Sequence, residues 1–378
     1  MDHNNPKDYY QLLGLAPLIN ATGTMTALGG SRLHPAAALA MAAAGGVYID
    51  LEQLHIKAGE YIAGLLGVEA ACVTAGAAAG MVLAAAACLA ENDPDIQARL
   101  PQPPSRCEII IQCCHRNPFE RAFQLVGAQI VQVGDAIHTR PDDLIAAIND
   151  RTAAIAHFLC ADMLEASLPL PEVLNIALRY GIPVIVDAAA EIPPKSNLWE
   201  IARQGADLVI FSGGKDMRGP QTSGLMVGRA DLISAARVQT APFECVAGRP
   251  MKASKELVIG FLAALEAYLQ EDEEARFQEW DAIAAYLQQA LSQIKGLTIM
   301  RYYPSQPYIQ PANIPRLQID LAPDLGITAQ SLSERLKEGV LPIHARCRGN
   351  ALTINVHTLV MDEARIIVER ITSILHGD

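Results

Sequence analysis

The chain has 378 residues, of which 51% are hydrophobic, and a formal net charge of −12. This length supports one large domain and a smaller one, each with its own core. The acidic balance disfavours a polyanionic partner such as tRNA or DNA unless a local basic face exists, and no run of basic residues stands out.

The eight cysteines form no CxxC pair and show no Cys/His spacing typical of a metal site. We therefore expect reduced thiols, no metal, and a cytoplasmic protein. The first residues lack the basic-then-apolar layout of a signal peptide. The uncharged stretch from Ala70 to Ala90 is long enough to span a bilayer, but it consists mostly of alanine and glycine, so we expect a buried helix rather than a membrane span.

Residues 1–16 are expected to form an N-terminal helix or arm. From Leu18 to about Ser254, short β-branched runs alternate with alanine-rich helical stretches. This pattern predicts an α/β domain with a mainly parallel sheet covered on both faces. The expected strands are residues 71–74, 108–112, 129–133, 152–157, 183–187, 208–211 and 225–228.

A long helical stretch from Lys255 to Ile294 then leaves the large domain, and its acidic run Glu271–Glu274 is expected to be a solvated helix face. Further strands are expected at residues 297–300, 316–321 and 351–356, followed by an amphipathic helix at 362–375. The predicted organisation is an arm (1–16), a large domain (17–254), and a linking helix with a small α+β domain (255–378).

Ligands of open α/β sheets bind beyond the carboxyl ends of the strands, and four features of this sequence fall there. Gly76, Ala77 and Ala78 lie between a strand and a helix, where small residues let backbone N–H groups approach a phosphate; a tightly packed helix start is the structural alternative. Asp187 ends another strand, where its carboxylate can keep a ring nitrogen protonated or cap the next helix.

The other two features follow the strands at 208–211 and 108–112. Lys215 comes after two glycines, and Ser212 can donate to the same phosphate. His115 can stack on a pyridine ring or transfer a proton, although a lone histidine is more often structural. Together with Asp187, these residue types describe a pyridoxal phosphate site, with Lys215 as the Schiff-base lysine and proton carrier.

The segment Ile19-Asn20-Ala21-Thr22-Gly23-Thr24 resembles the opening of the selenocysteine synthase-like (L-seryl-tRNA(Sec) selenium transferase-like) group of fold-type I pyridoxal phosphate enzymes. The resemblance covers nearly the whole chain, and it continues through residues 70–80, 127–134, 211–215, 219–224 and 342–346. Residues 115–118, 187–194 and 249–252 look most similar to the branch called D-glucosaminate-6-phosphate ammonia-lyase.

This resemblance implies the aspartate aminotransferase-like fold and a homodimer or higher assembly of dimers. By the family pattern, Lys215 carries the cofactor, Asp187 pairs with its ring nitrogen, and Ser212 with the Gly76 loop holds its phosphate. Selenium transferases carry an extra N-terminal tRNA-binding domain, whereas only 18 residues precede Ile19 here. We therefore expect a small-molecule substrate, no nucleic acid and no membrane.

An amino-acid substrate needs a cation for its carboxylate, and Arg346 is our first candidate, because small-domain arginines serve this role in fold-type I enzymes and bidentate pairing fixes orientation. Further candidates for binding the substrate are the cations Arg32, Arg116, Arg249 and Lys252, each of which could instead form a surface ion pair, and the hydroxyl of Thr24.

The leading hypothesis is a lyase that removes an α-proton and a β-hydroxyl and releases a 2-keto acid and ammonia from an amino acid or amino-sugar acid. The alternative is a racemase or epimerase that uses the same carbanion, with His115 or a cysteine as the second acid. Selenium transfer, C–S cleavage, aldol cleavage and a non-catalytic protein of this fold are further alternatives.

Overall fold

The computed structural model describes residues 9–161, 165–244, 246–304 and 311–376. The chain forms two compact units. The larger unit is built mainly from residues 31–271, and the smaller one from residues 1–30, 272–304 and 312–378. No helix of the described residues is long and apolar enough to cross a membrane.

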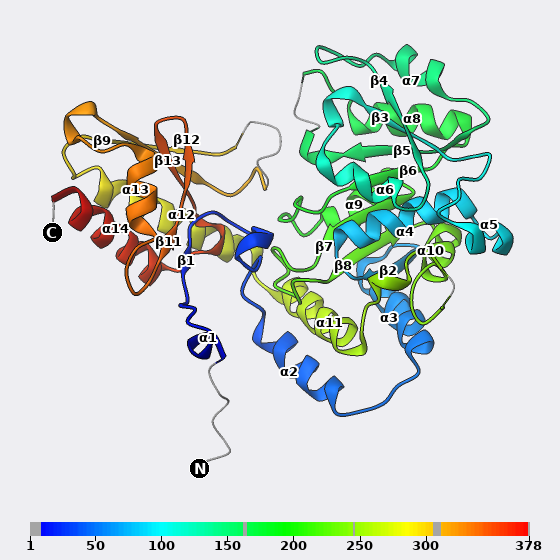
Figure 1. Cartoon of the computed structure of the whole chain (residues 1–378), viewed down its shortest axis with the longest axis horizontal. Helices are drawn as coiled ribbons and strands as arrows, with labels where there is room; N and C mark the ends of the chain where they lie inside the picture. The colour runs from blue at the N-terminus through cyan, green and yellow to red at the C-terminus, as the bar shows by residue number, and fades with distance from the viewer. Residues whose placement is uncertain (1–8, 162–164, 245, 305–310, 377–378) are drawn as a thin grey trace. The chain divides into compact units, whose positions relative to one another are not determined.

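A seven-stranded sheet with the order β2-β8-β7-β6-β5-β3-β4 forms the middle of the larger unit (Figure 1). Strand β8 runs antiparallel to both of its neighbours, while the other strand pairs are parallel. The strands are β2 (Ala70–Thr74), β3 (Glu108–Gln112), β4 (Gln129–Val133), β5 (Thr152–Phe158), β6 (Val184–Asp187), β7 (Leu208–Ser212) and β8 (Gly224–Gly228). All seven strands predicted for this domain are therefore confirmed.

Alternating side chains of each central strand pack into two separate cores, one on each face of the sheet. In β7, for example, Val209 and Phe211 belong to one core, while Leu208 and Ile210 belong to the other. The two faces are covered by helices, as an α/β/α arrangement requires. One face carries α4 (Ala77–Ala90), α5 (Pro94–Arg99), α6 (Arg121–Gln124) and α10 (Ala230–Arg237). The other carries α3 (Leu51–Leu66), α7 (Pro141–Ala147), α8 (Leu170–Tyr180), α9 (Asn197–Arg203) and α11 (Lys255–Gln270).

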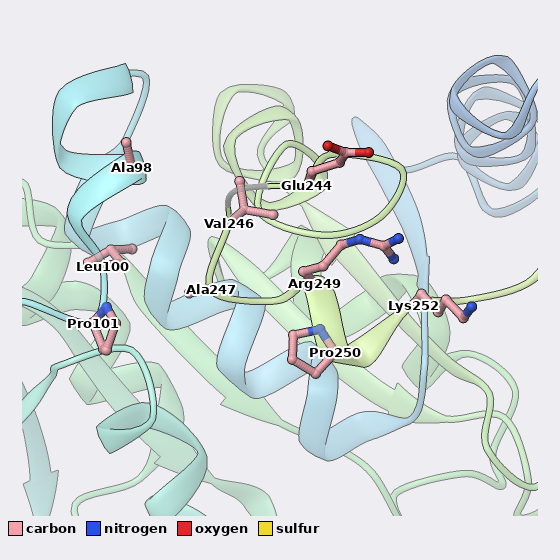
Figure 2. Close-up of a pocket in the computed structure, with 9 residues that line it drawn as sticks. All are labelled: Ala98, Leu100, Pro101, Glu244, Val246, Ala247, Arg249, Pro250 and Lys252. Carbon is pink, nitrogen blue, oxygen red and sulfur yellow. The ribbon is translucent and has the colours of Figure 1, made fainter.

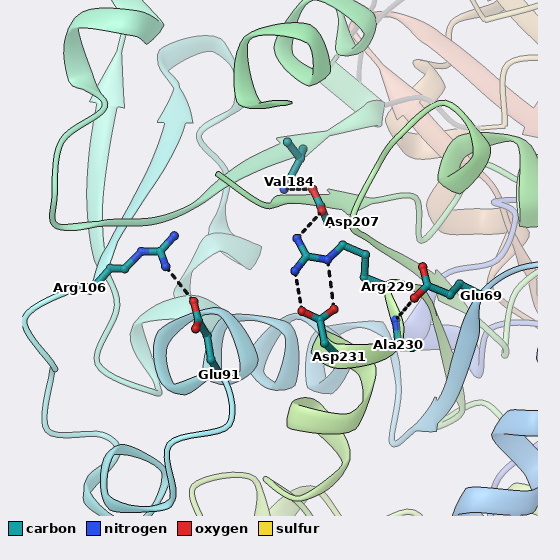
Figure 3. Close-up of polar contacts among 8 residues, drawn as sticks. All are labelled: Glu69, Glu91, Arg106, Val184, Asp207, Arg229, Ala230 and Asp231. Atoms are coloured by element: carbon teal, nitrogen blue, oxygen red, sulfur yellow. Dashed lines mark hydrogen bonds and ion pairs between the residues drawn. The ribbon is translucent and has the colours of Figure 1, made fainter. Parts of the chain in front are cut away.

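A charged network ties together the strand ends at one edge of this sheet (Figure 3). The Asp207 carboxylate accepts a hydrogen bond from the backbone N–H of Val184 at 2.8 Å and pairs with Arg229 at 3.0 Å. Arg229 also pairs with Asp231 at 2.6 Å. Asp207 directly precedes β7, and Val184 is the first residue of β6. The network therefore lies at the amino ends of these parallel strands, opposite the carboxyl ends where ligands bind.

The smaller unit has a four-stranded antiparallel sheet with the order β12-β13-β10-β9, and its helices pack on a common apolar core. A short parallel pair, β1 with β11, completes it. Its elements are α1 (Tyr9–Leu12), β1 (Ile19–Asn20), α12 (Glu273–Leu291), β9 (Leu297–Tyr302), β10 (Arg316–Leu321), α13 (Ala329–Leu336), β11 (Ile343–His344), β12 (Arg346–Arg348), β13 (Ala351–Asn355) and α14 (Met361–His376). Residues 1–8 of the expected arm lie outside the described residues.

The predicted long helix from Lys255 to Ile294 is two helices, α11 and α12, which meet at Glu271 and Asp272. The Asp272 side chain accepts a hydrogen bond from the N–H of Ala275 at 3.1 Å and so begins a new helix. The acidic run is therefore not one solvated helix face. Helix α11 belongs to the larger unit and packs along α2 (Pro35–Gly45), whereas the sequence analysis grouped it with the small domain.

Candidate active site

The register of the strands brings the predicted phosphate-binding residues to the same end of neighbouring strands. Gly224, the first residue of β8, is the partner of Thr74 at the end of β2 and of Ser212 at the end of β7. The loop at Gly76 and the hydroxyl of Ser212 therefore lie on either side of one strand. The register therefore brings these two segments, which are distant in the sequence, to the same end of neighbouring strands.

The start of helix α4 has the form of an anion cradle. Gly76 is its N-cap residue with φ 100°, and no side chain caps the helix. The Thr74 hydroxyl donates to the carbonyl of Gly76 at 2.9 Å and fixes the loop. A Cβ added at Gly224 would lie 2.6 Å from the carbonyl carbon of Gly76, so the two segments pack at backbone distance. Ala77 and Ala78 are not fully buried, and their uncapped N–H groups suit a phosphate.

Asp187 and Lys215 form the electrostatic centre of the site. Burial is the largest influence on the pKa of Asp187 and raises it. The hydrogen bond from the Ala189 N–H and the charge of Lys215 act in the opposite direction and lower this pKa. Burial lowers the pKa of Lys215, while the nearby charge of Asp187 raises it. The amine and the carboxylate are thus close enough to affect one another, and burial increases the neutral, nucleophilic fraction of the amine.

The lysine is held on a tight loop after β7. A Cβ added at Gly214 would lie 2.5 Å from Cα of Gln221, and one added at Gly213 would lie 2.2 Å from the hydroxyl of Ser223. Only glycine permits these approaches, which explains the two glycines before the lysine. The loop after β7 therefore packs directly on residues 219–223.

The sequence analysis did not single out two further groups near Lys215, namely Cys160 and Glu191. The charge of Glu191 raises the pKa of Lys215, and a thiolate at Cys160 would do the same. Burial raises the pKa of the Cys160 thiol to about 12, so this group stays neutral. Cys160 follows β5, whose Phe158 is in register with Asp187, and this pairing could have been found once the strand order was known.

His115 is fully buried at the end of β3, and both of its ring nitrogens are bonded within the protein. Nδ1 accepts a hydrogen bond from the backbone N–H of Phe158 at 3.1 Å, and Nε2 lies 2.7 Å from the Ser167 hydroxyl. Its ring also packs edge-on against His157, with centroids 4.5 Å apart. Because these bonds occupy both nitrogens, we do not retain His115 as a proton-transfer residue.

The substrate-binding candidates of the sequence analysis fall into separate groups. Arg32 lies between Ser31 and His34, whose backbone N–H groups donate to the carbonyls of Gly214 at 3.1 Å and Arg218 at 2.7 Å. The exposed Arg32 is therefore positioned beside the lysine loop. Its place next to Lys215 supports a role in binding the substrate.

Thr24 and Arg346 lie on neighbouring segments of the smaller unit. The backbone N–H of Ala21 donates to the carbonyl of His344 at 2.9 Å, and β1 pairs with β11 immediately before Arg346. The Arg346 side chain is exposed and has no ion-pair partner among the residues that the structure describes. It is free to bind an anion.

Arg249 and Lys252 line one wall of an open pocket of about 830 Å³ (Figure 2). Ala98, Leu100 and Pro101 line the same pocket. Within the described chain, neither cation has a hydrogen-bond or ion-pair partner for its side chain. The carboxylate of Glu244 lines the pocket as well, so two cations and one anion are available to a ligand there.

Arg116, by contrast, is bound within the protein. Its guanidinium makes two hydrogen bonds of 2.6 Å to the Glu120 carboxylate and another of 2.8 Å to Gln132. A bidentate pair of this kind leaves little of the guanidinium for a substrate. We therefore do not retain Arg116 as a substrate ligand.

The sheet with its antiparallel strand β8 and the lysine loop at its carboxyl edge define the fold-type I class of pyridoxal phosphate transferases and lyases. The family model for L-seryl-tRNA selenium transferase (SelA) matches residues 18–298, and the chain belongs to this family.

Two curated relatives and a solved structure are similar over nearly the full length. A 5'-C-glycyluridine monooxygenase-decarboxylase from Streptomyces sp is 34% identical, over 97% of this chain and 92% of the relative. The D-glucosaminate-6-phosphate ammonia lyase of Salmonella typhimurium is 30% identical, over 97% of each. A solved structure of D-glucosaminate-6-phosphate ammonia-lyase covers 99% of both chains, with a TM-score of 0.83 and 30% identity.

Proposed function

We propose that this protein is a pyridoxal-phosphate-dependent ammonia-lyase that converts an amino-sugar acid or amino acid into a 2-keto acid and ammonia. The observation that carries the proposal is the placement of Lys215 beside Asp187, at the same sheet edge as the uncapped start of α4. A lysine, a carboxylate and a phosphate cradle in this arrangement fit the cofactor. The similarity to an ammonia-lyase over both full chains supports the reaction.

In the proposed site, Lys215 holds the cofactor, Asp187 faces its ring nitrogen, and Ser212 with the N–H groups of Ala77 and Ala78 binds its phosphate. The cofactor, when bound, stabilises negative charge at the α-carbon of the substrate. We assign His115 no contact with the cofactor, because it is fully buried and both of its ring nitrogens are bonded within the protein.

Lys215 also moves the proton in this proposal. With the substrate held by the cofactor, the partly buried amine of Lys215 would be free to take the α-proton. The Lys215 ammonium would return this proton to the β-hydroxyl, which would leave as water, and a second water would convert the released enamine into the 2-keto acid and ammonia. The low exposure of the site favours this step, because a buried lysine is more readily neutral than a solvated one.

The cations suit a substrate with two anionic groups. Arg32, beside the lysine loop, is proposed to bind the carboxylate end, and Arg346 and Thr24 of the smaller unit remain candidates for substrate binding by the family resemblance. Arg249 and Lys252, unpaired on one pocket wall, are proposed to bind the distal phosphate of an amino-sugar acid. A phosphorylated amino-sugar acid such as D-glucosaminate-6-phosphate is accordingly the first candidate substrate to test.

A second candidate function is oxidative decarboxylation, and the 34% identity to the 5'-C-glycyluridine monooxygenase-decarboxylase favours it. Both reactions begin with negative charge at the α-carbon. They differ in the next step. In the lyase a β-hydroxyl departs, whereas in the oxygenase dioxygen reacts.

We further propose that the enzyme acts in the cytoplasm on a small molecule, without nucleic acid, as a homodimer or an assembly of dimers. The net charge of −12 and the free cysteines among the described residues support this setting. The assembly is testable by light scattering of the cofactor-loaded protein.

The experiment incubates the cofactor-loaded protein in D₂O with D-glucosaminate-6-phosphate, the unphosphorylated sugar acid and a glycyl nucleoside. Ammonia, 2-keto acid, dissolved oxygen and carbon dioxide are measured together. Equal release of ammonia and 2-keto acid without oxygen uptake supports the lyase. Oxygen uptake with carbon dioxide release supports the oxygenase instead, and α-deuteration with inverted configuration and no ammonia contradicts both.

A further inference from the structure

The lysine loop contains a residue in an unusual backbone conformation. Arg218 has φ 53°, in the left-handed region that side chains other than glycine rarely adopt. Its backbone N–H donates to the carbonyl of Lys215 at 3.1 Å, so the two residues close one tight turn. A non-glycine residue persists in this region only when its surroundings hold it there, and such residues concentrate at functional sites.

The backbone of this turn is held from the outside by the segment before α2. The N–H of His34 donates to the carbonyl of Arg218 at 2.7 Å, while Ser31 binds the carbonyl of Gly214 through both its N–H and its hydroxyl. The turn is therefore fixed on both sides of Lys215.

The side chain of Arg218 is held from a third direction. Its guanidinium forms an ion pair with the carboxylate of Glu271, whose side chain is only 18% exposed. Glu271 follows helix α11, and its backbone carbonyl accepts a hydrogen bond from Lys195, which also binds the carbonyl of Leu269 at 3.3 Å. Glu271 ends the main segment of the larger unit, residues 31–271, and Asp272 begins the next segment of the smaller unit.

We infer that Arg218 is a positioning residue, whose ion pair with Glu271 fixes the turn that presents the amine of Lys215 to its cofactor. The backbone bonds to Lys215 and His34 set the direction of the turn, and the ion pair anchors it to the end of α11. The inference rests on the proposed function, since it requires Lys215 to be the residue that carries the cofactor.

The test measures how fast the cofactor-free protein captures pyridoxal phosphate, followed by absorbance in the wild type, four variants of the Arg218–Glu271 pair and one control variant. Arg218→Ala and Glu271→Gln remove the pair from either side, the double variant removes both partners, and Arg218→Gly also removes the backbone constraint. Arg203→Gln is the control, because the Arg203–Glu200 pair is also in the larger unit and about half exposed. Thermal unfolding of each variant is measured alongside.

We expect Arg218→Ala and Glu271→Gln each to slow capture about tenfold, less than the roughly hundredfold cost that a 1 Å misplacement of a reacting group can bring. Arg218→Gly is slowed similarly, the double variant is no slower than either single variant, and Arg203→Gln matches the wild type. The double variant distinguishes one shared interaction from two independent effects.

Glu271→Gln keeps the backbone of Arg218 intact, so it remains informative if an Arg218 variant does not fold. Wild-type capture by Glu271→Gln, or multiplying effects in the double variant, would overturn the inference alone. Failure of the wild type itself to capture the cofactor on Lys215 would instead remove the proposed function.

Discussion

The amine of Lys215 lies among groups that shift its pKa in opposite directions. Burial is the largest influence and lowers the pKa, while the charges of Asp187 and Glu191 raise it. The balance leaves the amine more readily neutral than a solvated lysine, yet still close to a carboxylate. That combination suits a residue that attacks an aldehyde and later accepts a proton.

Because only the neutral amine attacks an aldehyde, we predict that cofactor capture by the apo-protein rises with pH and levels off below the ordinary lysine pKa of about 10.4. The sign follows from burial, which lowers the pKa of Lys215. The measurement is the capture rate between about pH 6 and pH 11, and a rate that still rises through pH 10.4 would contradict it.

Replacing Asp187 separates its two possible roles. We predict that Asp187→Asn reduces turnover roughly a hundred- to a thousandfold, as expected when one preorganised charge is removed from an active site. The asparagine oxygen can still accept the hydrogen bond from the N–H of Ala189, so the loop should remain folded. Steady-state kinetics of the loaded enzyme measure the effect, and unchanged turnover would reduce Asp187 to a helix cap.

Individual residue types predicted much of this site from the sequence, because Lys215 and Asp187 each follow an apolar strand. What the sequence could not provide was the hydrogen-bond partners. The nitrogens of His115 are occupied by Phe158 and Ser167, and Arg116 is paired with a glutamate. These contacts depend on loops whose paths local patterns do not determine.

Among the elements, the turns after β7 and before β8 require glycine because their backbones approach closely. Residues 213–214 and 219–224 pack backbone against backbone, and the register of β8 with β2 and β7 links this turn to the start of α4. The helix break at Asp272 was predictable only from its capping side chain, since the helical pattern continues on both sides.

The packing of this turn predicts different outcomes for two glycine-to-alanine substitutions. In Gly214→Ala, the new Cβ would lie 2.5–2.9 Å from backbone atoms of Gln221, so we expect a loss of about 1–3 kcal/mol in unfolding free energy and slower cofactor capture. In Gly64→Ala, within the exposed side of α3, no atom lies within 4 Å, and stability should rise by up to about 1 kcal/mol.

Chemical denaturation of both variants and of the wild type measures this difference. Equal stability of the two variants would show that the turn relaxes without cost. A Gly214→Ala protein that is destabilised but captures the cofactor normally would show that the glycine serves folding alone.

For the whole molecule, the alternation of strands and helices was enough to predict the sheet, because a strand buried on both faces has a distinctive apolar run. The division of the chain into two units was harder to predict from the sequence. Helix α11 joins the larger unit through α2, and the N-terminal strand β1 joins the smaller one through β11. Both associations connect segments far apart in the sequence.

The most direct test of the central claim is to locate the cofactor on the chain. The protein is incubated with pyridoxal phosphate, reduced with borohydride, digested and analysed by mass spectrometry. We predict a yellow protein that carries one pyridoxyl group on Lys215, and a colourless, unlabelled Lys215→Ala variant. Label distributed over other lysines, or a Lys215→Ala protein that remains yellow and labelled, would contradict the account.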